Sequence, residues 1–444
     1  MTRLHLILIN ALISVLFWCN QAFADTHSCS GTVSSCQSAV NVASDGDIIS
    51  IPQGSFTWSS GLSWTDKNIT LQGAGIGNTT ITNGIHNGMI VVYADTKPFR
   101  ITGMTINNSG GGAGWIGIYQ TCNLSPSCTP TMVNGWRIDH IRFNQSGVGS
   151  SYAILADGQF KGLIDNNYFY NNGGTFIGMR HISKGGTSDI GGLTGQWGEL
   201  AWKRPTRMGT DDAIFMEDNT VEKISGYTTI NDGSGGSRLV IRYNTFIGEN
   251  LGIQIHATGN PGRGAVFTEI YNNSWITQNY TNNIGIIRSG TGVIYNNTVV
   301  GTPNFLIDDQ RTCSAIMYPR CDGTYANDGN TAGEMGWPCM DQIGRGAGDG
   351  EPGTNNISEP LYVWNNGTMV FGLNAGVSCS SPSQGDHIKT YGDLPTHAGE
   401  VVDYVVGYPK PGYTPYTYPH PLAGGTPSPS DTTPPSAPTG VTVI

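Results

Sequence analysis

A six-residue segment with apolar residues at both ends recurs along the chain. Its seven copies begin at Ile101, Ile138, Ile164, Met216, Ile241, Ile270 and Ile294. Successive copies start 37, 26, 52, 25, 29 and 24 residues apart. A repeat of this length that holds short strands and no helix is typical of one coil of a β-solenoid, whose stacked coils bury a continuous apolar core. The pattern therefore predicts an all-β solenoid with insertions in its long intervals.

Five copies carry asparagine at the fourth position, namely Asn167, Asn219, Asn244, Asn273 and Asn297. In stacked coils these side chains would occupy one position of successive turns. There an asparagine can adopt the left-handed backbone conformation, and its amide can hydrogen-bond from coil to coil. Edge hairpins of a β-sandwich and glycosylation acceptors are the alternatives. Five asparagines in one register favour a structural ladder.

The segment before the repeats predicts a cap for the solenoid. Val33 to Ala43 has apolar residues at helical spacing, which suits a short amphipathic helix over the open end of the core. Four short segments follow it: Gly46-Asp-Ile-Ile-Ser-Ile-Pro52, Gly54-Ser-Phe-Thr-Trp58, Ile69-Thr-Leu-Gln-Gly-Ala-Gly75 and Thr80-Ile81. With the Asn repeats, this order resembles the pectin-lyase-like β-helix superfamily over roughly residues 28–301. The resemblance implies a single-stranded right-handed parallel β-helix.

The two ends of the chain predict different kinds of segment. Residues 1–24 have the features of a signal peptide, with Arg3, the apolar run Leu6 to Phe17 and the cleavage site Ala22-Phe-Ala24. We therefore expect an exported protein, extracellular or periplasmic, with a β-helix over residues 25–301. No later stretch is apolar enough to span a membrane.

After residue 301 the periodicity fades. Residues 302–423 are expected to hold further coils, disulfide loops and a Tyr/Pro tail packed on the barrel. Residues 424–444 are expected to form a linker and the truncated opening strand of a fibronectin type III-like module.

The cysteine count fits an oxidising compartment. Of nine cysteines, Cys19 lies in the signal peptide, which leaves an even number in the exported chain. We expect Cys29 to pair with Cys36 and Cys122 with Cys128. The last four cysteines allow three pairings, of which we favour Cys313 with Cys321 and Cys339 with Cys379. A zinc site is the alternative for the close pairs, but neither has a two-residue spacer.

Composition narrows the function classes. The chain has 63 glycines and only 12% charged residues, which is unusual for a helical or ordinary α/β enzyme. Its net charge of −10 argues against a nucleic-acid partner, because phosphate binding calls for a basic surface.

The interval of 52 residues holds a long insertion over residues 180–212. Between Arg180 and Arg207 we count five basic residues, Arg180, Lys184, Lys203, Arg204 and Arg207, against Asp189 and Glu199. The insertion also carries Trp197 and Trp202, which offer flat surfaces for sugar rings. We expect an electropositive loop beside the barrel.

Alignment of the strands after each Asn turn places four polar side chains in one row: Arg180, Asn231, His256 and Arg288. If Met179, Ile230, Ile255 and Ile287 point inward, strand alternation turns the four outward on adjacent coils, about 4.8 Å apart. A Gly-rich loop after His256 brings Arg263 nearby. The row predicts a saccharide groove; simple solvation of these side chains is the alternative.

The resemblance implies a polysaccharide lyase, since many members of the superfamily cleave uronic-acid polymers on the side of the barrel. β-Elimination needs a cation to neutralise the sugar carboxylate and a base to remove the C5 proton. Arg180, Arg288 or Arg263 would neutralise, and His256 or Lys203 would act as base. Asn231, Arg263, Trp202, Trp197, Arg204 and Arg207 would bind substrate.

We assign no metal ligands. Calcium stays open as a cofactor because it can replace an arginine in this reaction, although no dense acidic cluster demands it. We expect a monomer whose partner is a polysaccharide.

Two other functions stay open, so the sequence leaves enzymatic activity undecided. A glycoside hydrolase would resemble the polygalacturonase branch, whose Asp-Asp pair Asp211-Asp212 matches, while its Gly-His-Gly and Arg-x-Lys motifs are absent. Adjacent strand residues also point apart, which disfavours this pair as a hydrolytic or calcium site. A non-catalytic surface protein that binds glycan or acts as a structural module is the third hypothesis.

Overall fold

The computed structural model describes most of the β-helix and parts of the C-terminal region. The described residues are 24–85, 87–112, 114–121, 131–147, 149–183, 198–256, 263–276, 283–308, 341, 343–347, 357–374 and 403–424. Predicted features that fall outside these ranges are the signal peptide up to residue 23, the pair Cys122 and Cys128, the last four cysteines, Lys184, Asp189, Trp197, and the fibronectin-like segment after residue 424.

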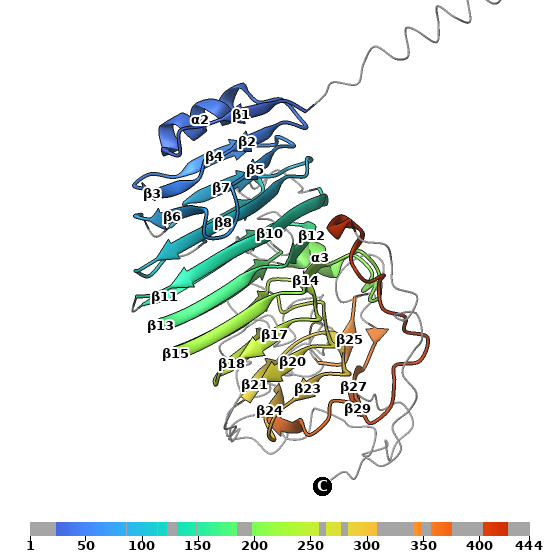
Figure 1. Ribbon diagram of the computed structural model, residues 1–444. Coiled ribbons are helices and arrows are strands. Elements are labelled where there is room, and N and C mark those ends of the chain that lie inside the picture. Colours follow the sequence, from blue (N-terminus) through green and yellow to red (C-terminus); the bar gives the residue numbers. More distant parts are fainter. Residues whose placement is uncertain are drawn as a thin grey trace, which may run out of the picture.

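The strands form a parallel β-helix with three faces, which we call sheets I, II and III (Figure 1). Each strand pairs in parallel with the strand one coil away, so the predicted fold class is confirmed.

Sheet I contains β1 (Thr26–Ser28), β2 (Ile48–Ser50), β5 (Thr70–Gln72), the first parts of β8 (Arg100–Asn108) and β10 (Val133–Gln145), β12 (Phe160–Asp165), β14 (Ile214–Glu217), β16 (Arg238–Arg242), β19 (Phe267–Tyr271), β22 (Thr291–Tyr295), β27 (Leu361–Trp364) and β29 (Tyr404–Val406).

Sheet II contains β3 (Gly54–Trp58), β6 (Thr79–Asn83), the second parts of β8 and β10, the first parts of β13 (Tyr168–Ile182) and β15 (Thr220–Ser234), β17 (Thr245–Ile247), β20 (Ser274–Ile276) and β23 (Thr298–Val299).

Sheet III contains β4 (Leu62–Thr65), β7 (Ile90–Tyr93), β9 (Ile116–Tyr119), β11 (Ser150–Asp157), the second parts of β13 and β15, β18 (Leu251–Ile255), β21 (Asn283–Ile287), β24 (Asn304–Asp308) and β28 (Val370–Asn374). A separate antiparallel pair joins β25 (Arg345–Gly346) and β26 (Ile357–Ser358).

The predicted repeat register holds along the whole stack. The first residues of the seven repeats form one buried column on sheet I, and the column continues to Val363. Ile164 pairs directly with Met216, so the interval of 52 residues covers a single coil plus an insertion. β13 runs to Ile182, and the insertion therefore begins only after that strand.

The asparagines form a buried ladder between sheets I and II. Each Nδ2 donates to the Oδ1 of the next asparagine: Asn167 to Asn219 at 3.1 Å, Asn219 to Asn244, Asn244 to Asn273 and Asn273 to Asn297 at 3.0 Å, and Asn297 to Asn366 at 2.8 Å. Asn366 is a sixth member that the repeat pattern missed, because its coil follows the long interval after residue 301.

The left-handed conformation does not fall on the ladder asparagines, so that expectation is wrong. It belongs to the residue before each of them: Asn166, Asp218, Tyr243, Asn272, Asn296 and Asn365, with φ between 52° and 56°. The preceding residue turns the chain through the corner, and the ladder side chain is thereby directed along the axis of the barrel.

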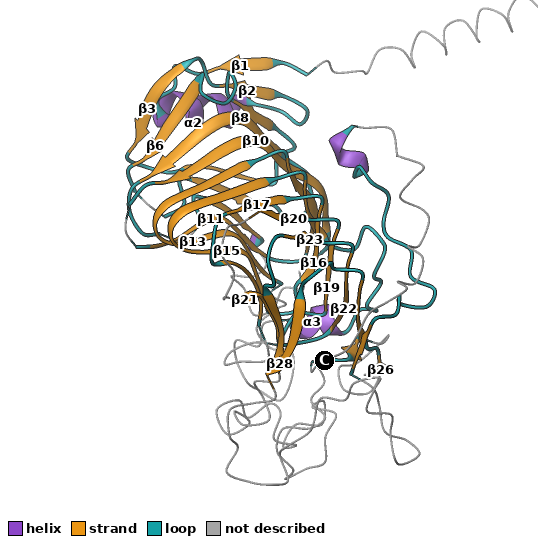
Figure 2. Ribbon diagram, turned by 60° about the horizontal axis from the view of Figure 1, so that its bottom comes forward, coloured by secondary structure: helices purple, strands orange, loops and turns teal. Residues whose placement is uncertain are grey.

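An α-helix caps the N-terminal end of the stack, as predicted. The helix α2 (Val33–Val42) lies against the first coils (Figure 2). Its residues Cys36, Ala39 and Val40 are buried. The Lys67 ammonium donates to the carbonyls of Val40, Asn41 and Ala43 at 2.8, 3.0 and 2.9 Å. A disulfide joins Cys29 to Cys36, with Cα atoms 4.8 Å apart. No described helix is long and apolar enough to cross a membrane.

Residues 407–424 return along the outside of sheet I, from β29 to β10; we call them the C-terminal strap (Figure 1). The Tyr413 hydroxyl bonds the Glu269 carboxylate, and Arg242 donates to the carbonyls of Tyr416 and Thr417 at 2.6 and 2.8 Å.

The strap ends in a 3-10 helix, η4 (Pro421–Ala423), where Arg137 donates to the Leu422 carbonyl at 3.0 Å. Under the strap, Arg242 pairs with Glu217 at 2.7 Å, both side chains having no exposed surface. Burial raises the pKa of the Glu217 carboxyl.

Candidate functional site

A carboxylate on the outside of sheet III contacts two of the predicted site residues. Asp232 on β15 lies between Arg180 on β13 and His256, which directly follows β18. The His256 Nε2 is 2.7 Å from Asp232 Oδ1, and the Arg180 Nε is 3.5 Å from Asp232 Oδ2. The side chains of Arg180 and His256 are 27% and 39% exposed, whereas that of Asp232 is 7% exposed. The carboxylate thus lies at ion-pair distance from two groups that solvent reaches.

Strand register explains this arrangement. Arg180 pairs with Asp232, and Asp232 pairs with Gln254 on the next coil. His256 lies two positions further along, where its backbone N–H donates to the Gly233 carbonyl at 2.8 Å. The predicted single row is therefore wrong: Arg180 belongs to one outward column, and His256 belongs to the next.

Asn231 is not part of the site. Its side chain points inward and is fully buried, with Nδ2 3.0 Å from the Met179 sulfur and 3.5 Å from the Met216 sulfur. The cause is a register shift between Thr229 and Asn231, where β15 carries an extra residue relative to β18. Asn231 pairs with Met179 on β13, and Asp232 pairs with Arg180. The ungapped alignment placed Asn231 opposite Arg180, one residue out of register, so it took Asn231 for the outward residue in place of Asp232.

Tyr152 on β11 is a further member that the sequence did not indicate. Its hydroxyl accepts a hydrogen bond from Arg180 Nη1 at 3.1 Å, and the Arg180 Cζ lies 5.3 Å from the centre of its ring. Tyr152 lies on the coil before the first ladder asparagine, Asn167. The strand alignment started on the following coil, at β13, and therefore did not include Tyr152. In the register of β11 with β13, Arg180 pairs with Leu155 and Ile177 pairs with Tyr152, so extending the row by one coil would have added Leu155 and not Tyr152.

Arg288 follows His256 by one coil, as the alignment predicted. Ile253 pairs with Gly285 and Ile255 with Ile287, and the Arg288 N–H donates to the Ile255 carbonyl at 3.1 Å. The Ser289 hydroxyl donates to the His256 carbonyl at 2.8 Å, which ties these two turns together.

A hollow of about 240 Å³ lies beside the cluster on β15, β18 and β21. Gln254, which pairs with Asp232, lines it, and its Nε2 donates to the Tyr227 hydroxyl at 2.7 Å. The hollow therefore adjoins the cluster through Gln254, and none of Arg180, Asp232 and His256 lines it.

Arg263 and Trp202 are buried, contrary to the expectation that they face substrate. Arg263 is 2% exposed, and its carbonyl accepts from the Gly235 N–H at 2.8 Å. Trp202, at the end of α3 (Glu199–Trp202), is also 2% exposed and donates from Nε1 to the Gly264 carbonyl at 2.9 Å. Trp202 thus anchors the insertion to the barrel, whereas the Arg263 backbone joins two loops of adjacent coils.

Arg204 of the insertion and Arg238 of β16 pair with one buried carboxylate. Arg204 and Arg238 approach the two oxygens of Asp212 at 2.8 and 2.9 Å. Asp212 is therefore engaged by cations, and it does not form a hydrolytic pair with Asp211. Lys203 is half-buried after α3, and Arg207 is exposed.

His181 is excluded as a proton carrier although it adjoins Arg180. Burial lowers the pKa of His181 to about 4, and its Nε2 lies 3.3 Å from the Gly158 carbonyl. The described residues contain no group of three or more His, Cys, Asp and Glu side chains that could hold a metal ion.

Comparison with known proteins adds one structural similarity. No family model matches the sequence, and no curated protein matches it. Among solved structures, an alginate lyase from Paenibacillus sp. str. FPU-7 matches with a TM-score of 0.33 and 16% identity, over 64% of this chain and 93% of that chain. The fold of the present chain rests on its own strand pairing.

Proposed function

We propose that the chain is an exported polysaccharide lyase that cleaves a uronic-acid polymer by β-elimination on the outside of sheet III. The contact of Asp232 with both His256 and Arg180 carries this proposal. This contact places a histidine ring beside a carboxylate. It also places a guanidinium at the same surface. These are the base and the cation that the reaction requires.

In the proposed reaction, Arg180 binds the carboxylate of the sugar and stabilises the negative charge that develops on it. Asp232 Oδ1 lies 2.7 Å from His256 Nε2, which leaves Nδ1 to remove the C5 proton. The C4–O bond then breaks, a C4–C5 double bond forms, and the leaving oxygen takes a proton from the Tyr152 hydroxyl. Because that hydroxyl accepts from Arg180, its own proton is available for this transfer.

The test is an assay on alginate, pectate, hyaluronan and chondroitin that follows the ultraviolet absorbance of the unsaturated product. We expect product from at least one polymer, and a loss of about 10²- to 10⁴-fold in kcat for His256→Ala. The variant Asp232→Asn should also lose activity, because a neutral amide stabilises the positive charge that develops on the imidazole during proton removal less than a carboxylate does.

Ile276→Ala is the matched control, because Ile276 lies on sheet II, half exposed and away from the cluster. It should retain the activity of the unchanged chain. Absence of unsaturated product from all four polymers, with binding retained, would support the non-catalytic glycan-binding protein instead. Full activity in His256→Ala would contradict the assigned base.

A further inference from the structure

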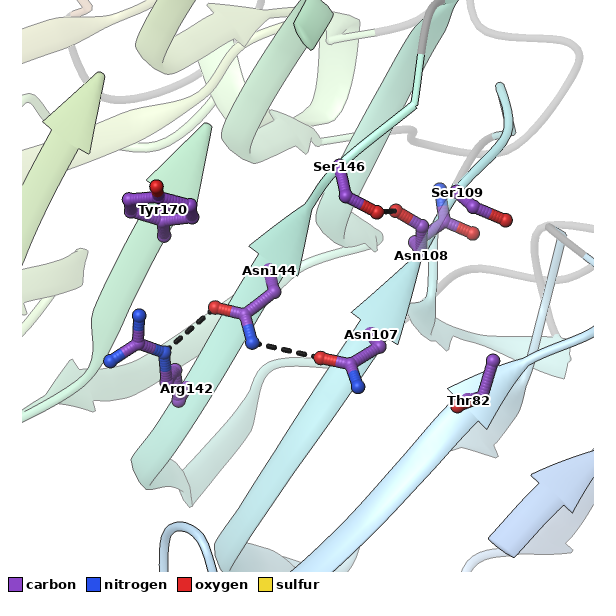
Figure 3. A pocket seen from close by; sticks show the side chains of 8 residues that line it. All are labelled: Thr82, Asn107, Asn108, Ser109, Arg142, Asn144, Ser146 and Tyr170. Carbon is purple, nitrogen blue, oxygen red and sulfur yellow. Dashed lines mark hydrogen bonds between the residues drawn. The ribbon is translucent and has the colours of Figure 1, made fainter. Parts of the chain in front are cut away.

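A polar groove on the outside of sheet II has no part in the proposed reaction. Its volume is about 450 Å³, and it spans β6, β8, β10 and β13 (Figure 3). We call it the amide groove; its lining residues are Thr82, Asn107, Asn108, Ser109, Arg142, Asn144, Ser146 and Tyr170. Sites for small ligands commonly have volumes of about 300–1,000 Å³.

A chain of hydrogen bonds crosses the groove floor and leaves several donors unused. Arg142 Nε donates to Asn144 Oδ1, and Asn144 Nδ2 donates to Asn107 Oδ1, both at 2.8 Å (Figure 3). Within the described part of the chain, the terminal nitrogens of Arg142 and the Nδ2 of Asn107 have no protein acceptor, and Arg142 has no ion pair. A ligand with acceptor oxygens would complete these donors.

Two tyrosines flank the guanidinium. The Arg142 Cζ lies 4.6 Å from the ring centre of Tyr168 and 5.4 Å from that of Tyr170. These cation–π contacts position the guanidinium over the outer strand surface. They leave the N–H groups of its terminal nitrogens available for hydrogen bonds. The Tyr170 ring itself lines the groove and offers an apolar face with a polar tip.

The turns beneath the groove are fixed by a second, buried set of amides. Asn108 Nδ2 donates to Gln145 Oε1 at 2.9 Å, and Gln145 Nε2 donates to the Gly147 carbonyl at 3.1 Å. Asn171 Nδ2 donates to Thr228 Oγ1 at 2.6 Å on the next coil. The groove is therefore formed before any ligand arrives, which lowers the entropic cost of binding.

We propose that the amide groove is a second saccharide-binding site, which takes a uronic-acid unit. Arg142 would bind the carboxylate, Asn107 would donate to hydroxyls, and Tyr170 would pack against the sugar ring. A single guanidinium among amides and hydroxyls fits a ligand with one charge per unit and many hydroxyls. The site lies on another sheet than the Asp232 cluster and does not depend on lyase activity.

The experiment measures binding of tetrasaccharides of alginate and of polygalacturonate by calorimetry, with cellotetraose as a neutral probe. It uses the full chain carrying Arg180→Gln, which weakens the sheet III cluster. We expect this variant still to bind an acidic probe. The added substitution Arg142→Gln should weaken that binding at least about tenfold, since a charge-assisted contact is lost. Binding of cellotetraose should stay unchanged.

Ile276→Ala is again the control, because Ile276 lies in the same outward column as Tyr170, further along the stack. Arg142→Lys keeps the charge and should recover part of the affinity, which separates a lost ligand contact from a damaged fold. Equal affinity with and without Arg142, or no acidic binding in the Arg180→Gln chain, overturns the proposal. If the chain has no lyase activity but binds an acidic probe through Arg142, the proposed function is refuted and the proposal for the amide groove stands.

Discussion

At the scale of single residues, each interior asparagine of the ladder satisfies several buried groups at once. Asn244 accepts at Oδ1 from the backbone N–H and the Nδ2 of Asn219, both at 3.0 Å. Its own Nδ2 donates to the carbonyls of Met216 and Arg242 at 2.9 Å, and to Asn273. No apolar side chain of similar size can replace these bonds.

Asn244→Ala should therefore lower the free energy of unfolding by at least about 2 kcal/mol, because it leaves several buried donors and acceptors without partners. Urea denaturation followed by circular dichroism measures the change. Asn172→Ala, on the exposed side of β13, is the control and should cost less than about 0.5 kcal/mol. Equal losses in the two variants would show that the ladder contributes no stability of its own.

At the scale of elements, α2 depends on a side chain from outside the helix for its C-terminal end. Lys67 binds three carbonyls there, where the helix leaves its last carbonyls without internal partners and carries partial negative charge. The capping helix is thus attached to the coil that carries Lys67.

Lys67→Met should lower the thermal midpoint of the chain, because it removes the three hydrogen bonds and the favourable charge, a loss of about 1–2 kcal/mol. Lys97→Met is the matched control. Lys97 pairs with Asp45 in solvent, with 41% and 47% of the side chains exposed, and such pairs contribute about 0–1 kcal/mol. A larger effect at Lys97 than at Lys67 would contradict this account of the cap.

The elements also show how far the sequence predicts this protein. Repeat spacing predicted the sheet I column correctly, and the helical spacing of apolar residues predicted the capping helix, because apolar periodicity is a property of each segment by itself. The bulge in β15 has no such signature, and a shift of one residue exchanges the inside and the outside of a strand. The alignment therefore assigned Asn231 as the outward residue, whereas the structure has Asp232 there. Burial of Arg263 and Trp202 depends on contacts between distant segments, which no local pattern contains.

At the scale of the whole molecule, the C-terminal strap makes stability depend on pH. The His420 N–H donates to Glu217 at 2.8 Å, and its ring nitrogen Nδ1 accepts from the Leu422 N–H at 3.1 Å, which requires a neutral ring. Burial, followed by the nearby charge of Arg242, lowers the pKa of His420 to about 4.

Because the pKa of His420 is lowered in the folded chain, the unfolded chain binds the extra proton first as the pH falls. Stability should be unaffected above about pH 6.5 and should decrease towards pH 4, by up to about 1.4 kcal/mol per pH unit for each such histidine. His181 contributes in the same window. His420→Gln should reduce the slope of unfolding free energy against pH between these limits, measured by urea titration. An unchanged slope would contradict the role of His420.

The strap has a consequence for how the molecule comes apart. In a solenoid each coil contacts only its neighbours, so the terminal coils can open while the middle stays folded. Here the bond from Arg137 to Leu422 joins residues 285 positions apart in the sequence, and Tyr413 and His420 contact coils between them. The last coil cannot fray unless the strap also leaves the central coils. The coils from β10 to β29 are therefore built to unfold as one cooperative unit, although their architecture is that of a modular stack.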